Sequence, residues 1–147
     1  MGRLIETLGH KDYLDTNIII YIIEGKDEFA LLLDEFLDAL NNSEITAVTS
    51  EITIAETLVI PFKNSDEHFQ IIYKNFLTST TNFEIVPISR KVLESAAEIR
   101  ATKRLKLPDA VHWVTAGLYS CDSFLTNDRS FKNLSPDIVH LISDLNS

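Results

Sequence analysis

The stretch Lys11-Asp12-Tyr13-Leu14-Asp15-Thr16-Asn17-Ile18-Ile19-Ile20-Tyr21-Ile22-Ile23 is almost entirely apolar past Asp12, apart from three small polar residues in a row, Asp15, Thr16 and Asn17. It is too short to span a membrane, because a spanning helix needs about 20 apolar residues. We interpret it as a buried strand that passes directly into a helix, with Asp15 where the strand ends. A buried carboxylate is costly unless a cation or several donors compensate it, so Asp15 is the first candidate functional residue.

The length and composition are those of a compact protein with a sizeable core. The chain has 147 residues, of which 45% are apolar, and we expect a single domain over residues 1–147. The lone cysteine, Cys121, excludes an intrachain disulfide and fits a reducing compartment. The first residues contain no long apolar segment typical of a secretory signal. We therefore expect a cytoplasmic protein with no membrane association.

The net charge is strongly negative, at −9, and the pI is about 4.8. This charge argues against a non-specific nucleic-acid binder, which normally presents a basic face. It is compatible with a cluster of carboxylates around a metal ion, and equally with a basic protein partner.

Predicted strands and helices alternate along the chain. We expect strands at 13–15, 45–48, 83–88, 123–126 and 138–142, and helices at 16–24, 27–40, 51–60, 65–77, 90–105 and 108–120, with Pro61 as a helix boundary. Several of the strands are short and apolar without alternation, which is typical of a parallel sheet covered by helices on both faces. The predicted fold class is α/β, with a central, mainly parallel sheet of about five short strands flanked by helices.

Four acidic residues stand at positions where this fold would bring them together. Asp15 and Asp128 each follow a predicted strand, and ligands of open α/β sheets lie beyond the carboxyl ends of the strands. Glu56 lies within an apolar helix, and Asp109 begins a helix after Pro108. Each acid alone also has an ordinary explanation: an exposed helix edge for Glu56, a favourable helix N-terminus for Asp109 and a turn for Asp128.

Several carboxylates at one end of a sheet cannot all ionise unless something positive joins them. Hard divalent cations prefer oxygen ligands, and Mg²⁺ typically binds one or two carboxylates, several waters and a substrate phosphate. The chain has no Cys and His spacing typical of a zinc site, no Gly-Lys-Ser/Thr phosphate loop and no Gly-rich dinucleotide motif after a strand. The sequence therefore favours a site for a hard divalent cation such as Mg²⁺ over these other kinds of site.

In chain order, these motifs resemble the PIN-domain family, and within it the VapC-like toxins of bacterial and archaeal toxin–antitoxin pairs. The resemblance covers residues from about 12 to about 142, and it rests on Leu14-Asp15-Thr16-Asn17, Glu56, Pro108-Asp109-Ala110 and Leu125-Thr126-Asn127-Asp128. It implies one PIN-like domain over residues 1–147. It also implies a Mg²⁺- or Mn²⁺-dependent endoribonuclease, in which a metal-activated water cleaves RNA phosphodiester bonds. Residues 1–11 precede the first strand, and this segment is longer than the resemblance leads us to expect for the smallest members.

The resemblance assigns roles to the acids and suggests partners. Catalytic and metal-binding roles fall to Asp15, Glu56, Asp109 and Asp128, with Asp15 and Asp109 holding the metal most directly. The implied partners are an RNA substrate, a cognate antitoxin protein and a second copy of the chain.

Other polar residues have two explanations each. Asn17 and Thr126 either orient water or a carboxylate in the site, or only form a turn and a cap. One dense basic group is a candidate for RNA-backbone contacts, or else a solvated helix face: Arg100, Lys103, Arg104 and Lys106. His112 lies one turn beyond Asp109, and we interpret it as a packed helix residue outside the catalytic set.

Two other functions are alternatives to the ribonuclease. Haloacid-dehalogenase-type phosphatases also place an Asp after the first strand, but they need a second Asp two residues later, where this chain has Asn17. A non-catalytic PIN-like or receiver-like module would use the same acidic pocket for binding alone. Metal-dependent RNA cleavage would distinguish the ribonuclease from both.

Overall fold

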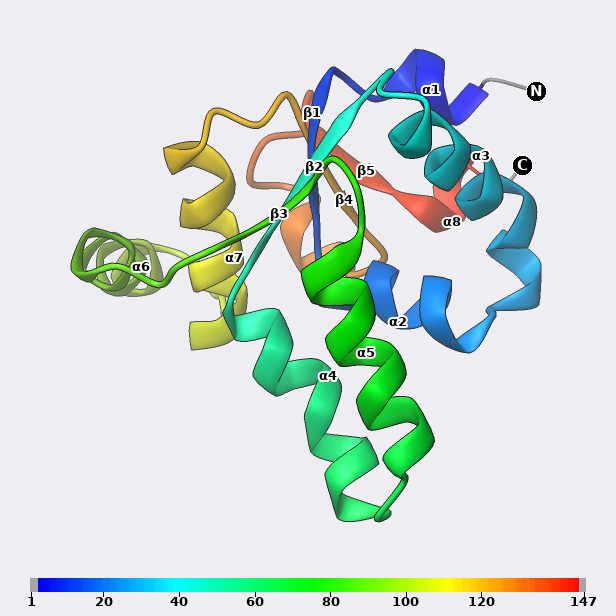
Figure 1. Cartoon of the computed structure of the whole chain (residues 1–147). Coiled ribbons are helices and arrows are strands. Elements are labelled where there is room, and N and C mark those ends of the chain that lie inside the picture. Colours follow the sequence, from blue (N-terminus) through cyan, green and yellow to red (C-terminus); the bar gives the residue numbers. More distant parts are fainter. Residues whose placement is uncertain (1–2, 146–147) are drawn as a thin grey trace.

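The computed structural model describes residues 3–145, and within them five parallel strands form one sheet (Figure 1). The strand order is β3-β2-β1-β4-β5, so the strand nearest the N-terminus lies at the centre. The strands are β1 (Lys11–Leu14), β2 (Thr46–Ser50), β3 (Phe83–Val86), β4 (Ser123–Thr126) and β5 (Val139–Leu141). The predicted α/β class, with a parallel sheet flanked by helices, is confirmed.

Helices cover both faces of this sheet. They are α1 (Arg3–Thr7), α2 (Thr16–Glu24), α3 (Ala30–Asn41), α4 (Ile52–Lys63), α5 (Glu67–Ser79), α6 (Arg90–Thr102), α7 (Leu107–Leu118) and α8 (Ile142–Leu145), with single 3-10 turns at Asp27–Phe29 and Arg129–Phe131. Helix α7 packs on one face with α6 outside it, while α1, α2 and α3 lie on the other side (Figure 1). Helices α4 and α5 form a hairpin that extends away from the sheet.

The central strand explains why the deciding stretch is so apolar. Tyr13 is buried on the α7 side with Val48 and Phe124, whereas Leu14 is buried on the other side with residues of α2 and α3. Because both faces of β1 are covered, successive side chains are all buried and the sequence does not alternate. The chain then turns directly into α2, whose Ile18 and Ile19 are also buried.

Pro61 does not end α4, contrary to the prediction. It is buried within the last turn, and the helix continues to Lys63. Because proline has no N–H, one backbone hydrogen bond of the helix is lost at this position, and the burial of the ring offsets part of that cost. Other bounds differ by a few residues: β1 begins at Lys11, β3 ends at Val86, and Ile142 begins α8 instead of ending a strand.

The segment before the first strand forms α1, which packs on α3. Gly9 joins it to β1 and passes so close to Asp122 that an added Cβ would lie 2.2 Å from the Asp122 Cβ. The Asp122 carboxylate accepts the backbone N–H groups of His10 and Lys11 at 3.0 and 2.9 Å. These contacts fix where β1 starts.

Across residues 3–145, no helix combines the length and the apolar character that crossing a membrane requires.

Candidate active site

Asp15 lies at the carboxyl end of β1, where it caps the N-terminus of α2, and it is only 5% exposed. Its Oδ1 accepts the Thr16 N–H at 2.9 Å. Its Oδ2 accepts the Thr126 hydroxyl at 2.7 Å and the Asn17 side-chain amide at 3.2 Å. The structure thus brings the two residues expected to orient the site, Asn17 and Thr126, onto one oxygen of Asp15.

Asp109 lies in the first turn of α7, where the charges of the other three acids act on it. Its pKa is raised to about 6, first by burial and then by repulsion from Asp15, Asp128 and Glu56. Burial also raises the pKa of Asp15, although His112 and the hydrogen bonds from Thr126 and Thr16 oppose that rise. The four predicted acids therefore lie close enough to interact electrostatically at the carboxyl edge of the sheet.

Glu56 projects from α4 toward this edge, with its side chain 32% exposed. Its Oε1 accepts the Thr16 hydroxyl at 2.8 Å and lies 2.7 Å from His112 Nε2. Burial works to raise the pKa of Glu56, but the His112 and Thr16 contacts outweigh it and the pKa is lowered. An exposed position on a helix edge therefore does not fully explain Glu56, because one of its carboxylate oxygens is held inside the site.

Asp128 stabilises a turn, as expected for an acid after a strand, and it also lies beside the other acids. Its side chain caps the 3-10 turn that follows β4, where Oδ1 accepts the Ser130 N–H at 2.9 Å and the Ser130 hydroxyl at 2.7 Å. Its own N–H donates to Thr126 Oγ1 at 3.0 Å. Thr126 thereby links Asp128 to Asp15.

His112 is the residue that sequence reasoning left out. It is 1% exposed on α7, with Nε2 lying 2.7 Å from Glu56 Oε1 and 3.6 Å from Asp15 Oδ1. Its Nδ1 lies 2.6 Å from the Tyr13 hydroxyl of β1. The spacing from Asp109 placed His112 on the same helix face, but a buried histidine is so often a core residue that spacing alone did not select it.

The family of the chain follows from the comparison with known protein families. The PIN domain model matches residues 13–135, a range that contains all four acids. The chain belongs to the PIN domain family.

Solved structures with this fold include two from toxin–antitoxin systems. A toxin–antitoxin complex from Klebsiella pneumoniae contains a chain 27% identical to this PIN domain, with a TM-score of 0.67, covering 89% of this chain and 97% of that chain. VapBC2 from Rickettsia felis, bound to a DNA fragment from its promoter, contains a chain that is 22% identical to this one, with a TM-score of 0.68. The match covers 89% of this chain and 98% of that chain. A search of the curated proteins finds no match. The predicted likeness to VapC-like PIN domains is confirmed.

The acidic edge of this PIN domain fits a hard divalent cation. Its charged donors are the oxygens of Asp15, Glu56, Asp109 and Asp128, the atoms that Mg²⁺ and Mn²⁺ prefer. Within residues 3–145, no group of three or more His, Cys, Asp and Glu side chains forms a ready-made cage. Mg²⁺ needs none, because it usually keeps several waters and binds one or two carboxylates. A cation here would also relieve the repulsion that raises the pKa of Asp109.

The basic residues gather in the last turn of α6 and in the connection from α6 to α7, shortly before Asp109 in the sequence. They line an open hollow of about 520 Å³ that includes Arg100, Lys103, Arg104 and Lys106, all exposed. Arg100 also has a structural contact, because its Nε donates to the Leu105 carbonyl at 3.1 Å. The hollow is thus a cationic surface on a PIN domain of net charge −9.

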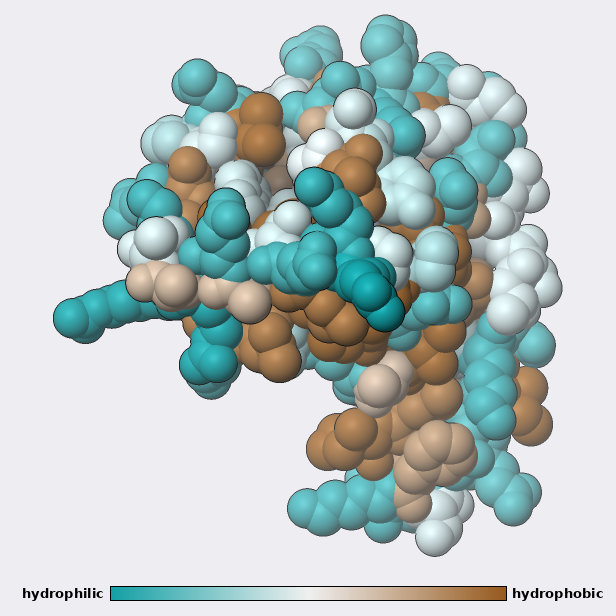
Figure 2. All heavy atoms as spheres, turned by 90° about the vertical axis from the view of Figure 1, so that its left-hand side faces the viewer, coloured by the Kyte–Doolittle hydropathy of each residue, from teal (hydrophilic) through white to brown (hydrophobic). Residues whose placement is uncertain are grey.

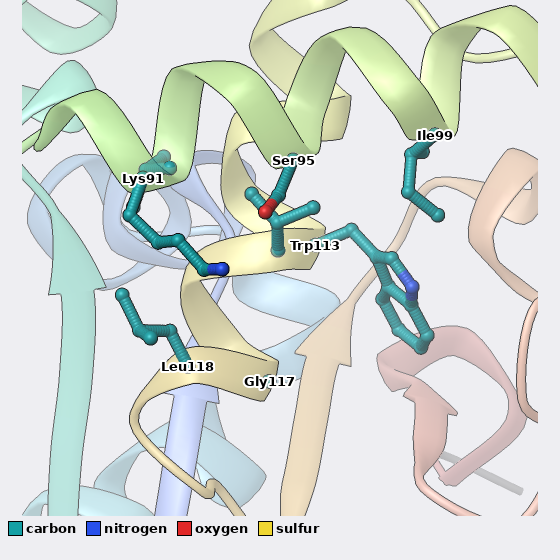
Figure 3. Close-up of a pocket in the computed structure, with 8 residues that line it drawn as sticks. Lys91, Ser95, Ile99, Trp113, Gly117 and Leu118 are labelled. Atoms are coloured by element: carbon teal, nitrogen blue, oxygen red, sulfur yellow. The ribbon is translucent and has the colours of Figure 1, made fainter.

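A smaller hollow of about 280 Å³ lies between α6 and α7 (Figure 3). Lys91 and Ser95 of α6 face Trp113 and Leu118 from α7 across it. None of the four acids lines this hollow, so it is separate from the acidic edge.

Proposed function

We propose that this PIN domain, acting as one domain over residues 1–147, is a Mg²⁺- or Mn²⁺-dependent endoribonuclease and the toxin of a toxin–antitoxin pair. The observation that supports the proposal is the grouping of carboxylates at one edge of the sheet: His112 Nε2 lies 2.7 Å from Glu56 and 3.6 Å from Asp15, and Thr126 joins Asp15 to Asp128. Asp109 lies near enough to these acids for their charges to help raise its pKa. Membership of the PIN family and the likeness to toxin–antitoxin structures support it.

Each acidic side chain has a proposed task. Asp15 and Asp109 hold the metal most directly, and Glu56 and Asp128 bind it directly or through water. A divalent cation held by these residues would lower the pKa of a bound water molecule and polarise the scissile phosphate. Thr126 and Asn17 keep Asp15 Oδ2 in place through their hydrogen bonds of 2.7 and 3.2 Å. In-line attack leaves a 5′-phosphate and a 3′-hydroxyl.

The RNA backbone is proposed to cross the basic hollow before it reaches the acids. Lys and Arg contacts to phosphate position a nucleic acid without reading its sequence. The hollow beside α7 is suited to this role because Lys106 caps the same helix whose first turn carries Asp109.

The α4–α5 hairpin supports the proposal of an antitoxin partner. Figure 2 shows hydrophobic side chains gathered on this protruding part of the molecule. The exposed large apolar residues there are Ile54, Val59, Ile60, Phe62 and Ile71. Exposed apolar surface on this scale is typical of protein–protein contacts. We propose that an antitoxin covers it, that the chain also forms a homodimer, and that both encounters take place in the cytoplasm.

The test is cleavage of labelled total tRNA and structured RNA by the purified protein with Mg²⁺, with Mn²⁺ and with EDTA. Wild type is compared with Asp15→Asn and with Asp34→Asn, an exposed acid of α3 outside the site. We expect discrete cuts that need the metal, that vanish in Asp15→Asn and that persist in Asp34→Asn.

Cleavage that ignores the metal or the Asp15 change would point to a contaminating nuclease and would contradict the proposal. Metal binding without cleavage of any RNA in the mixture would favour the non-catalytic binding module.

A further inference from the structure

The hydrogen bonds around His112 indicate that its Nε2 carries a hydrogen. Glu56 Oε1 accepts the Thr16 hydroxyl at 2.8 Å, and the oxygens of a carboxylate accept hydrogen bonds. His112 Nε2 lies 2.7 Å from Glu56 Oε1, and it therefore carries a hydrogen that it donates to that oxygen. Thr16 Oγ1, 3.1 Å away, lies within reach of the same N–H. A ring nitrogen that carries a hydrogen has no free lone pair in the ring plane, so Nε2 is no metal ligand.

The other ring nitrogen is held by Tyr13. The Tyr13 hydroxyl oxygen accepts the Ser50 backbone N–H at 3.1 Å, and a backbone N–H can only donate. A tyrosine hydroxyl that accepts this hydrogen bond still has its own hydrogen to donate. His112 Nδ1 lies 2.6 Å from this oxygen. For the neutral ring, Tyr13 thus donates to Nδ1 and leaves the hydrogen on Nε2.

Rigid packing holds both members in place. Tyr13 is fully buried and stacks on Phe124, with ring centroids 5.1 Å apart and planes 9° apart. His112 is 1% exposed and meets the Tyr13 ring edge-on at 5.7 Å. The pair therefore joins the central strand to α7 directly behind the acidic edge.

We propose that Tyr13 and His112 form a positioning pair that orients Glu56 for metal binding by fixing its Oε1 and presenting Oε2 to the cation or its water. The proposal rests on the proposed function, because it concerns the same site. The donors of Thr16 and His112 meet at Oε1, so that oxygen is occupied from the protein side. Outer-sphere partners of ligating carboxylates commonly contribute about 10- to 100-fold to metal affinity or activity.

The first readout is the tautomer of His112 in the metal-free wild type, measured by ¹⁵N NMR of the labelled ring. We expect a protonated Nε2 in a hydrogen bond, and an Nδ1 that is either unprotonated or, in the charged ring, protonated as well. A ring with hydrogen on Nδ1 and none on Nε2 would overturn the proposal.

The second readout is Mn²⁺ affinity, measured by titration of variants whose folding is checked by thermal unfolding. We expect Tyr13→Phe and His112→Phe to weaken Mn²⁺ binding about tenfold or more. His112→Gln keeps a side-chain N–H donor and should retain more affinity than His112→Phe. The matched controls are Tyr119→Phe, beyond the far end of α7, and His68→Gln, exposed on α5, which should bind as wild type does.

The outcomes separate this inference from the proposed function. Unchanged Mn²⁺ affinity in folded Tyr13→Phe and His112→Phe would overturn the positioning role, even if the wild type cleaves RNA. Weakened affinity in both, with a wild type that cleaves no RNA, would uphold the pair and contradict the ribonuclease. A wild type that binds no Mn²⁺ would contradict both.

Discussion

Two buried carboxylates stand near opposite ends of the central strand, and their surroundings differ. Asp15, at the carboxyl end, accepts hydrogen bonds from three groups and faces other acids. Asp12, near the amino end, is fully buried; Ser123 donates to its Oδ1 at 2.5 Å, and Oδ2 has no hydrogen-bond partner within the described residues. Burial raises the pKa of Asp12 to about 6. Asp12 therefore lowers the stability of the fold at neutral pH.

Asp12→Asn is expected to stabilise the protein at neutral pH. The pKa of Asp12 is 3.8 in the unfolded chain and about 6 in the folded state, so the folded state binds this proton more tightly. The stability gained from the protonated Asp12 is therefore complete below about pH 4 and is lost as pH rises through 6. Since one pKa unit corresponds to about 1.4 kcal/mol, the gain is at most on the order of 3 kcal/mol. Urea unfolding across this pH range measures it. A difference between Asp12→Asn and wild type that does not grow with pH would contradict this account.

Helix α2 begins at a residue that serves both structure and chemistry. Asp15 has extended backbone angles (φ −68°, ψ 156°), and its side chain accepts the Thr16 N–H, as an N-cap does. The same residue thus marks the end of β1, caps α2 and contributes a carboxylate to the acidic edge. A substitution at this position has to be chosen so that the loss of the charge is separated from the loss of the cap.

Asp15→Asn and Asp15→Ala are expected to differ in stability and to agree in activity. Both remove the buried charge, but Asn is a good N-cap and Ala is not, so Asp15→Ala should be less stable than Asp15→Asn by about 1 kcal/mol. Both should lose RNA cleavage, because neither supplies a carboxylate to a metal. Chemical unfolding with EDTA present, alongside the cleavage assay, measures the two effects. Equal stability of the two variants would show that the cap contributes little, and cleavage by either would remove Asp15 from the catalytic set.

Over the whole molecule, charge is separated between an acidic body and a basic hollow. The net charge of −9 repels RNA, yet four cations lie together beside the helix that carries Asp109. Such a distribution steers a polyanion toward one edge and away from the rest of the surface. The basic hollow should therefore govern RNA binding more than the chemical step.

Lys103→Ala combined with Arg104→Ala is expected to raise KM for RNA several-fold and to leave kcat nearly unchanged. Removing two phosphate contacts should also make the dependence of log KM on log salt shallower by roughly one to two. The matched control is Lys63→Ala with Lys74→Ala, two exposed lysines of the α4–α5 hairpin. Steady-state kinetics at several salt concentrations provide the measurement. A fall in kcat at constant KM would argue against a role in RNA binding.

Much of the fold could be predicted from the sequence, because local patterns determine it. The apolar stretch at 11–23 indicates a strand buried on both faces, and β4 has the predicted bounds, 123–126. Long-range contacts could not be predicted in this way. The hydrogen bond from Tyr13 to His112 joins residues 99 positions apart, and no local pattern signals it. Pro61 lies inside α4 and its ring is buried there, which the sequence alone does not show.

The candidate site, like the fold, could be predicted only where local sequence patterns determine it. Asp15 and Asp128 could be placed at one edge because each follows a strand, and Asp109 because it begins a helix after Pro108. The pairing of Glu56 with His112 depends on how α4 packs beside α7, which only the tertiary structure shows. His112 was therefore missed, although it touches one of the predicted acids.

The most direct test of the account is the binding of Mn²⁺ to the metal-free protein, because the central claim is that the acids at the sheet edge act as one metal site. Wild type is compared with Asp15→Asn, Asp109→Asn and the control Asp34→Asn. The account predicts one binding event that both site variants weaken by about tenfold or more and that Asp34→Asn leaves unchanged. Binding that survives in both site variants, or that all three substitutions weaken alike, would contradict it.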